Sequence, residues 1–247
     1  MKFGIYLLIF FTFFYSCKEQ NKKIKSKSNT SLDVNLQSKD SVSNLKIEKV
    51  TSTFISDNFN YNGKLKDVIK WVDKEGTHIV FTGHKFYYSD YIYDTIRVDI
   101  DGEEKVINQE TYKQNAEIFC YHYKLIENKY KLDWKLYDES LKCPMDALCK
   151  FINKSIEITD LNNDNIAEIW TMYRIACRGD ISPSDLYLIM YENDKKYIIE
   201  GTSLIDIAPN EKYGGEISKI TGFKKNDDFY LYALKKWKEN LKDTFEE

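Results

Sequence analysis

The chain has 247 residues, and its hydrophobic residues (43%) and aromatic residues (15%) are too numerous for a wholly disordered protein. Its 36 Lys and Arg residues nearly balance its 39 Asp and Glu residues, which gives a net charge of -3. A nucleic-acid partner needs a concentrated basic face, so this balance argues against nucleic acid as a ligand. The 19 Tyr residues and the low Pro content favour a β-rich fold.

The N-terminus has the pattern of an export signal. A positively charged start precedes an apolar run over residues 4–15, which is too short to cross a bilayer. A small residue and Cys17 follow, and this junction resembles the lipobox of bacterial lipoproteins, although Phe14 stands where Leu is usual. We predict a signal peptide over residues 1–16 and lipidation at Cys17. The alternative is an ordinary secretory signal followed by a free or buried cysteine.

The lipobox resemblance implies a location for the protein. A lipidated Cys17 carries more than one acyl chain, and each buried methylene contributes roughly 0.8 kcal/mol, so the anchor is effectively permanent. Lys18 and Glu19 resemble the short charged signal that Bacteroidetes use to send lipoproteins to the outer face. We expect a lipid-anchored outer-membrane protein, on the periplasmic face or at the cell surface, with the membrane as its first partner.

Residues 17–50 are predicted to form a lipidated, flexible tether. The stretch from Lys18 to about Lys49 is rich in Lys, Ser, Asn and Gln and contains no aromatic residue, Gly or Pro. Such a segment buries too little apolar area to order itself. The alternative is a short amphipathic helix through apolar residues whose spacing fits neither the helical nor the strand period well: Leu32, Val34, Leu36, Val42, Leu45 and Ile47.

Residues 51–247 are predicted to form a single, mainly β globular domain built from antiparallel hairpins. Three hairpins are expected, each with two β-rich runs around a polar turn: 67–72 and 77–82 around Asp73–Gly76, 116–126 and 130–137 around Glu127–Lys129, and 186–191 and 196–200 around Glu192–Lys195. The Asp-led turns at 73–76 and 160–165 suggest a degenerate repeat, so the hairpins are expected to form either propeller-like blades or a sandwich. The alternative is that any β protein shows such look-alike hairpins.

The C-terminal region has a different period. Six apolar residues near helical spacing, with Lys and Glu between them, predict an amphipathic helix: Phe229, Leu231, Leu234, Trp237, Leu241 and Phe245. We expect this helix to pack against the sheet through Trp237.

One loop has the spacing of a calcium site. Side-chain oxygens occur at loop positions one, three, five and nine, and a backbone carbonyl is available at position seven: Asp160, Asn162, Asp164, Glu168 and Ile166. Asn165 stands at position six, where Gly is preferred, and Asn tolerates the left-handed conformation best among the other residues. Position twelve is Thr171 and the flanks are strands, so the loop is not an EF-hand.

The acidic loop, which we define as residues 160–168, resembles the calcium loop of FG-GAP and related propeller-type repeats, in which such a loop joins two strands of a blade. The resemblance implies calcium as a cofactor that stiffens the hairpin. The alternative is an Asn-rich turn with solvated carboxylates.

Four cysteines follow the tether, which is an even number in an exported chain: Cys120, Cys143, Cys149 and Cys177. They allow two disulfides in three connectivities, and oxidised pairing is the expected state. We favour Cys143 with Cys177, since the two flank the acidic hairpin. A zinc site is the alternative, but the five residues between Cys143 and Cys149 exceed the usual spacing.

The sequence contains no recognisable catalytic constellation. His78, His84 and His122 are scattered, with neither a metal-ligand pattern nor a nucleophile elbow nearby. His78 and His122 lie in strand patterns and are interpreted as partly buried scaffold. We therefore expect no triad.

The chain as a whole resembles a family of flavobacterial surface lipoproteins provisionally linked to surface polysaccharide biosynthesis. The resemblance rests on the lipobox, the tether, the Trp71-x-Asp73 hairpin, the acidic loop and the stretch from Cys177 to Pro183. It implies a non-enzymatic envelope protein that binds a glycan or a protein partner. The alternative is a carbohydrate-active enzyme, which would need two carboxylates facing one another at roughly 5 to 9.5 Å.

Overall fold

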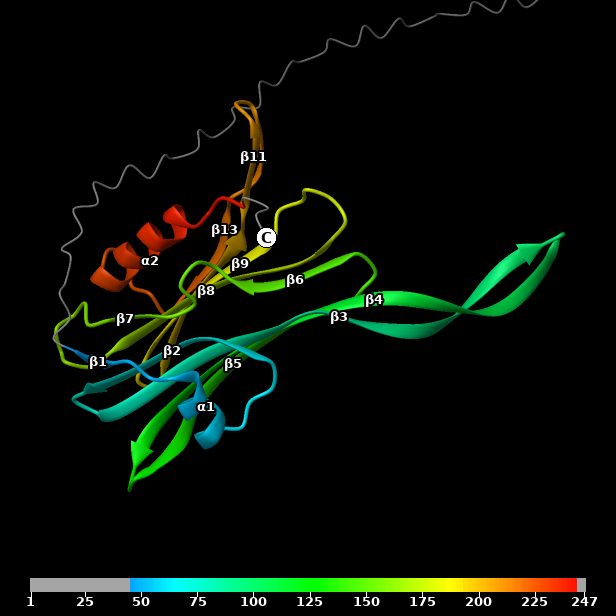
Figure 1. Ribbon diagram of the computed structural model, residues 1–247. Helices are drawn as coiled ribbons and strands as arrows, with labels where there is room; N and C mark the ends of the chain where they lie inside the picture. The colour runs from blue at the N-terminus through cyan, green and yellow to red at the C-terminus, as the bar shows by residue number, and fades with distance from the viewer. Residues whose placement is uncertain (1–44, 244–247) are drawn as a thin grey trace, which may run out of the picture. The chain divides into compact units, whose positions relative to one another are not determined.

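The computed structural model describes residues 45–243, without the side chains of residues 87, 88 and 90–94. Cys17, the predicted signal peptide and Phe245 lie outside the described residues. Two large sheets, a small two-stranded sheet and two helices make up this part of the chain (Figure 1). None of its helices has the length and apolar character needed to cross a membrane.

The first sheet has the strand order β1-β2-β3-β4-β5, so each strand pairs with its neighbour in sequence. All of these pairings are antiparallel. The strands are β1 (Lys46–Glu48), β2 (Lys64–Asp73), β3 (Gly76–Ile100), β4 (Glu103–Ile126) and β5 (Lys129–Cys143).

The second sheet has the order β13-β10-β9-β8-β6, and β7 pairs with β8 beside this path. Its strands are β6 (Asp146–Phe151), β7 (Glu157–Thr159), β8 (Glu168–Arg178), β9 (Asp185–Glu192), β10 (Lys195–Thr202) and β13 (Ile217–Thr221). A separate two-stranded sheet contains β11 (Leu204–Ala208) and β12 (Glu211–Gly214). The helices are α1 (Ser52–Asn58) and α2 (Asp228–Glu239).

The predicted fold class is confirmed: the protein is mainly β, its sheets are antiparallel, and a helix lies near the C-terminus. The three predicted hairpins are β2–β3, β4–β5 and β9–β10. Their turns contain residues with positive φ, as the turn residues predict: Gly76 at 123°, Asn128 at 58° and Asn193 at 50°. The described strands form neither a closed barrel nor a propeller, so the propeller-like alternative is wrong.

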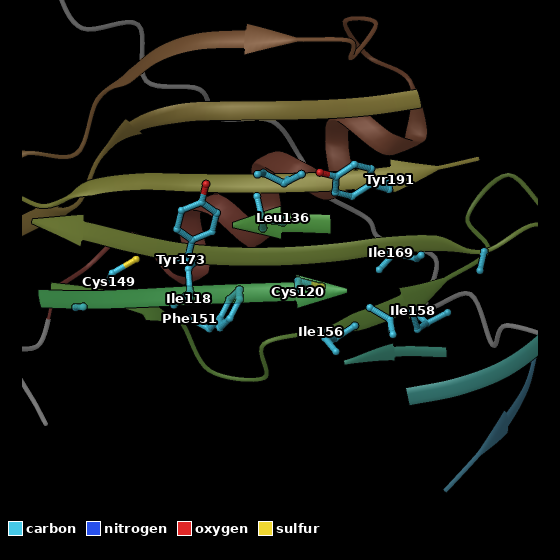
Figure 2. Close-up of a cluster of buried hydrophobic side chains, with 14 of the residues drawn as sticks. Ile118, Cys120, Leu136, Cys149, Phe151, Ile156, Ile158, Ile169, Tyr173 and Tyr191 are labelled. Atoms are coloured by element: carbon cyan, nitrogen blue, oxygen red, sulfur yellow. The ribbon is translucent and has the colours of Figure 1, made fainter. Parts of the chain in front are cut away.

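The main core lies between the two sheets. Strand residues alternate in direction, and the inward set from each sheet is apolar. Ile118, Cys120 and Leu136 of the first sheet meet Phe151, Ile169 and Tyr173 of the second (Figure 2). Because both sheets lose their apolar faces to the same cluster, neither face would be stable alone in water.

Each helix covers an outer face. Ile55 and Phe59 of the α1 region pack on Phe81 and Phe119 of the first sheet. In the same way, Trp237 of α2 packs with the apolar outer face of the second sheet, as predicted, and is only 4% exposed. Four layers result, in the order α1, first sheet, second sheet, α2. The α2 helix ends at Glu239, earlier than the predicted 245, with Asn240 as its C-cap.

Two features of the N-terminal part correct the sequence interpretation. The predicted tether reaches residue 50, but β1 pairs with β2, so the folded part begins earlier. Ile47 in β1 is 54% exposed, so this strand is held mainly by backbone hydrogen bonds. Its sequence therefore lacks the alternation of buried and exposed residues that would predict a strand. The α1 helix was also unexpected. It is short, and Thr51 caps it by accepting a hydrogen bond from Phe54 N.

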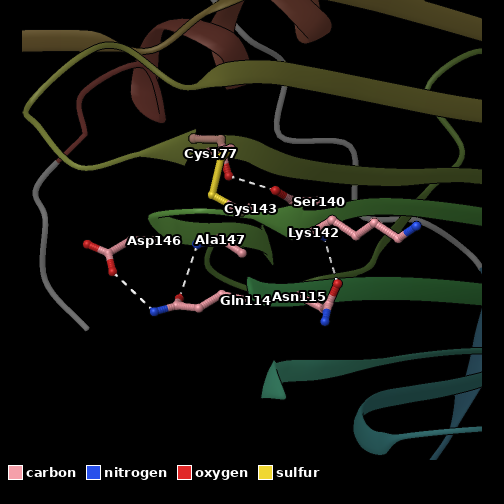
Figure 3. The surroundings of a disulfide bond; sticks show 9 residues. Gln114, Asn115, Ser140, Lys142, Cys143, Asp146, Ala147 and Cys177 are labelled. Carbon is pink, nitrogen blue, oxygen red and sulfur yellow. Dashed lines mark hydrogen bonds between the residues drawn. A yellow bond between two sulfur atoms is a disulfide. The ribbon is translucent and has the colours of Figure 1, made fainter. Parts of the chain in front are cut away.

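The predicted Cys143–Cys177 disulfide is confirmed (Figure 3). It joins the end of β5 to β8, and therefore the first sheet to the second. Hydrogen bonds surround it: Ser140 donates to the carbonyl of Ala176, and Lys142 N donates to Asn115 Oδ1.

The expectation of a second disulfide is wrong, because Cys120 and Cys149 are free thiols. Both are fully buried in the core between the sheets. Cys149 Sγ donates to the carbonyl of Asp138. Burial raises the pKa of both thiols, so both stay protonated.

The disulfide should contribute strongly to stability, because it closes a loop with a sequence separation of 34 residues. Replacing Cys143 and Cys177 together by Ser is expected to lower the free energy of unfolding by about 2–4 kcal/mol. Urea denaturation of the oxidised protein and of the double variant measures the difference. Equal midpoints and slopes would contradict the expected contribution.

Candidate functional site

The acidic loop connects β7 to β8 in the second sheet. Asn163 and Asn165 adopt the left-handed conformation, with φ of 57° and 61°, so Asn165 serves at position six as predicted. Asp164 N donates to Asn162 Oδ1 at 3.1 Å, and Ile166 N donates to Asp164 Oδ1 at 2.9 Å. These bonds curl the loop so that backbone N–H groups turn toward its own side-chain oxygens.

Two carboxylates of the loop are buried. Asp160 is 3% exposed, and its Oδ1 is fully buried without a hydrogen-bond partner. Glu168 is fully buried and accepts hydrogen bonds from Leu161 N and from the Thr159 hydroxyl, the latter at 2.6 Å. An unpaired buried carboxylate oxygen is costly, so Asp160 marks a place where a cation or a donor would be stabilising.

The pKa of Glu168 is raised to about 7. Burial is the main cause, and the nearby charges of Asp160 and Glu192 add to it. The bonds from Thr159 and Leu161 oppose the shift without cancelling it. The loop therefore carries more buried negative charge than its own donors compensate.

Glu192, at the end of β9, is a member of this acidic group that sequence reasoning missed. It is 6% exposed, and its Oε1 accepts from Asn162 Nδ2 at 3.0 Å. The same amide nitrogen lies 3.1 Å from Asp164 Oδ2, so Asn162 links two carboxylates. Glu192 lay in a predicted turn, and nothing in the sequence indicated that this turn reaches the loop between β7 and β8.

The donor chemistry of the acidic loop suits calcium, which takes carboxylate, amide and backbone carbonyl oxygens together. Within residues 45–243, no three His, Cys, Asp or Glu side chains are placed to share a metal ion. A bound ion would therefore depend on the Asn162 amide oxygen and the Ile166 carbonyl as well as on carboxylates. The calcium site stays a prediction.

The acidic loop is fastened to the first sheet at the β2–β3 turn. Lys74 N donates to the carbonyl of Asn165 at 2.9 Å, and Ala167 N donates to Asp73 Oδ2 at 3.2 Å. The two Asp-led turns that suggested a repeat are thus spatial neighbours. They belong to different sheets and do not form equivalent blades.

Asp73 accepts four hydrogen bonds from different parts of the fold. Besides Ala167 N, the donors are Trp71 Nε1 at 3.0 Å, Glu75 N at 2.8 Å and His78 Nε2 at 2.9 Å. Burial alone would raise the pKa of Asp73, but the bonds from His78 and Trp71 outweigh it and lower that pKa to about 2. Asp73 is therefore ionised throughout the physiological range.

His78 and His122 continue this arrangement into a hydrogen-bonded chain. His78 Nδ1 lies 3.1 Å from His122 Nε2, and His122 Nδ1 lies 3.0 Å from Asp133 Oδ2. Each imidazole is 3% exposed, and both rings stack nearly parallel to the Trp71 ring. The buried scaffold role expected of these histidines agrees with this burial, but their link to two aspartates was not foreseen.

The geometry fixes how many hydrogens the chain can hold. The nitrogens that face Asp73 and Asp133 each carry one, and the two nitrogens between the rings share one. Three hydrogens on four nitrogens complete the chain, so the pair then carries one positive charge between two aspartates. A fourth would set two N–H groups against each other. Burial also lowers the pKa of His122, against the opposing bond to Asp133.

A shallow pocket opens beside this chain, with room for about one water molecule. It is lined by residues of both sheets and of the acidic loop, among them Asp73, His122, Asp133, Trp134, Ala167 and Tyr191. Its two carboxylates are separated by both imidazole rings, which is not the arrangement of a glycosidase pair.

Comparison with known proteins adds no relative: no family model, curated protein or solved structure matches this chain. Inferences about the site therefore rest on its own chemistry.

Asp73→Asn should destabilise the fold. Both Asp73 oxygens now accept hydrogen bonds, and the amide NH₂ of Asn would replace one of them with a donor that faces other donors. We expect a loss of about 3 kcal/mol in the free energy of unfolding. Asp133→Asn is the matched control, since Asp133 is 29% exposed and should lose at most about 1 kcal/mol. Urea denaturation at neutral pH measures both. Equal losses would contradict the central place of Asp73.

Glu168 should make stability pH-dependent in the absence of calcium. Its pKa of about 7 lies above the ordinary 4.5, so its contribution is complete below pH 4.5 and is lost as pH rises through 7. With a chelator present, wild type should lose on the order of 2 kcal/mol more than Glu168→Gln between pH 5 and pH 8. Parallel pH profiles for the two proteins would show that the Glu168 carboxylate is not held as described.

Proposed function

We propose that this chain is a lipid-anchored protein of the cell envelope whose folded domain has a binding role and whose acidic loop holds calcium. The domain would bind a glycan or an envelope protein, in surface polysaccharide biosynthesis or handling. The observation that carries the calcium part is the buried Asp160 oxygen without a partner.

Two separate features of the chain support the envelope location. The N-terminal apolar run with Cys17 has the pattern of a lipoprotein signal. The Cys143–Cys177 disulfide supports an oxidising compartment, since such bonds are rare in the cytosol. The two observations are independent, because one comes from the leader and the other from the fold.

Calcium is supported by the charge balance around the acidic loop. Asp160, Glu168 and Glu192 are all buried, and Glu192 lies 3.7 Å from the ammonium group of Lys195, whose side chain is 73% exposed. A divalent cation would neutralise charge that the fold otherwise leaves in a poorly solvated place. The proposed ligands are those of the sequence pattern: Asp160, Asn162, Asp164, the Ile166 carbonyl and Glu168. Because no three carboxylates within residues 45–243 are placed to share an ion, binding would have to draw the acidic loop more tightly around it.

A binding role is favoured over catalysis by the histidine chain. Both nitrogens of His78 and both of His122 are already engaged within the protein. Neither ring, as placed, offers a free nitrogen to take a proton from a substrate. The pocket beside them is also too small to enclose a sugar ring, so a glycan would bind on the surface.

A thermal melt of the full chain with calcium or with a chelator tests the calcium site. We expect calcium to raise the midpoint, because a ligand that binds only the folded state stabilises it. At a ligand concentration 100 times the dissociation constant, the free energy of unfolding rises by about 2.7 kcal/mol. Asp160→Asn should abolish most of this response. Asp194→Asn is the matched control, because Asp194 is exposed in the neighbouring turn, and it should respond like wild type.

An unchanged midpoint at millimolar calcium would reject the calcium site. An equal response of the Asp160→Asn and Asp194→Asn variants would place the calcium effect elsewhere on the chain.

The anchor is tested separately by mass spectrometry of protein from the membrane fraction. We expect the mature N-terminal peptide to begin at Cys17 and to carry the added mass of acyl chains. Cys17→Ser should lack those chains. A mature terminus at another residue, without fatty acid, would reject the lipoprotein assignment.

A glycan array probed with the full chain tests the ligand class. If no glycan binds, the glycan part of the proposal is rejected, and an envelope protein is the partner to identify.

A further inference from the structure

Four side chains form a row across the first sheet, beside the acidic loop. Asp73 comes from β2, His78 from β3, His122 from β4 and Asp133 from β5, so each of four neighbouring strands supplies one group. Hydrogen-bond distances of 2.9, 3.1 and 3.0 Å join them in that order. These four side chains are the histidine chain, and their three bonds link the strands in addition to the backbone ladders.

The histidine chain is closed to solvent at one end and open at the other. Both imidazoles are 3% exposed and the Asp73 side chain is 2% exposed, whereas the Asp133 side chain is 29% exposed. Lys124 Nζ lies 3.4 Å from Asp133 Oδ2. Asp133 therefore has water and an ammonium group as other partners, and the Asp73 end depends on donors within the protein.

Few charged or titratable groups surround the two rings. Asp73, Lys124 and Asp133 come from the first sheet, and Tyr191 of the second sheet lines the same pocket. Burial raises the pKa of Tyr191, so its hydroxyl stays neutral. The other lining residues are uncharged: Trp71, Trp134, Ile166, Ala167, Ile169 and Asn193. Two carboxylates and one ammonium group leave one negative charge, which one positive charge on the imidazole pair balances.

The number of hydrogens on the two rings decides how many of the three bonds form. With three hydrogens on the four ring nitrogens, all three bonds form. With two, one bond is lost, because a nitrogen without hydrogen cannot donate to a carboxylate. The bond to Asp133 is the one lost, since water and Lys124 replace it there. With four, two N–H groups face each other across 3.1 Å, and the rings have to separate.

The lowered pKa of His122 agrees with the three-hydrogen state, in which that ring is neutral. A neutral His122 accepts a hydrogen bond at Nε2 from His78 and donates one at Nδ1 to Asp133. The positive charge then lies on His78, directly beside the ionised Asp73. The buried end of the histidine chain therefore holds the charge, and the open end holds the replaceable bond.

We propose that the histidine chain is a pH-sensitive latch across the first sheet, closed only while the two imidazoles hold three hydrogens between them. Rising pH opens it at Asp133, next to Trp134, whose ring stacks on Tyr191 of the second sheet with 3.9 Å between centroids. Falling pH opens it between the rings, beside the pocket that both sheets line. Each opening loosens the contact between the sheets at this place. The proposal depends neither on calcium nor on the lipid anchor.

The latch predicts a contribution to stability that is greatest near the ordinary histidine pKa of about 6.5. Below that pH the unfolded chain holds four hydrogens on these rings and the folded chain three, so stability falls as pH falls. Above it the unfolded chain holds two and the folded chain three, so stability falls as pH rises. On each side the unfolding equilibrium constant changes by up to about tenfold per pH unit. The titration belongs to the pair and not to either ring alone.

Nuclear magnetic resonance of the full chain with ¹⁵N-labelled histidine counts these hydrogens directly. The sequence has three histidines, so His84, which lies outside the histidine chain, is an internal control that should titrate on its own. At pH 6.5 we expect three protonated nitrogens across His78 and His122, and a scalar coupling through the hydrogen bond between them. A total of two or of four hydrogens at this pH, or rings without this coupling, would overturn the proposal.

Urea denaturation in the presence of a chelator, from pH 5 to pH 9, compares wild type with His122→Gln. A Gln amide can donate to Asp133 and accept from His78, so the variant closes the row with one charge on His78. Below pH 6.5, the wild-type unfolding constant should rise relative to that of the variant by up to about tenfold for each pH unit of acidification. Above pH 6.5 the ratio should stay constant. Groups that titrate equally in both proteins, such as Glu168, cancel in this ratio.

The double variant His78→Gln/His122→Gln should lose the pH dependence on both sides, because no imidazole remains to hold the third hydrogen. His84→Gln is the matched control. It also lies in β3, and it should keep the coupling between the other two rings. A ratio of wild-type to double-variant unfolding constants that does not change from pH 5 to pH 9 would contradict the latch. If the double variant does not fold, the hydrogen count and the His122→Gln ratio decide the question.

Discussion

The site depends on one buried carboxylate. Asp73 accepts hydrogen bonds from its own hairpin, from a histidine and from the acidic loop of the other sheet, so a single side chain joins three parts of the fold. Because it stays ionised, it also sets the sign of the charge that the histidine pair can accept. The Asp73 carboxylate therefore links the position of the acidic loop to the protonation of the two imidazoles. A change in one is expected to alter the other.

Local patterns predicted what is local. The hairpin turns, the apolar alternation of the strands and the burial of Trp237 are all properties of short segments, and each agreed with the structure. The sequence did not predict the β1 strand or the α1 helix. The β1 strand buries few side chains, and the α1 helix spans only about two turns. The sequence predicted only part of the cysteine pairing. The bonded cysteines, Cys143 and Cys177, lie near the ends of two strands. Cys120 and Cys149 instead lie at inward-facing core positions of their strands.

The site was less readable than the fold, because its members meet only across sheets. Asp73 and His78 are five residues apart and face one another across a turn, but Asp133 reaches His122 from the next strand. Glu192 joins the acidic loop from a hairpin thirty residues away. A linear sequence shows which residues can bear charge. It does not show which sheet lies on which, and that stacking decides which charges become neighbours.

The two free thiols, Cys120 and Cys149, affect how well the Cys143–Cys177 disulfide is preserved. Only a thiolate attacks a disulfide, and burial keeps Cys120 and Cys149 in the unreactive, protonated form. The folded core thus protects the Cys143–Cys177 bond from exchange with its own neighbours. Any event that opened the sheets would expose two nucleophiles beside one disulfide, so a loosened molecule would scramble its sulfur linkages and lose the route back.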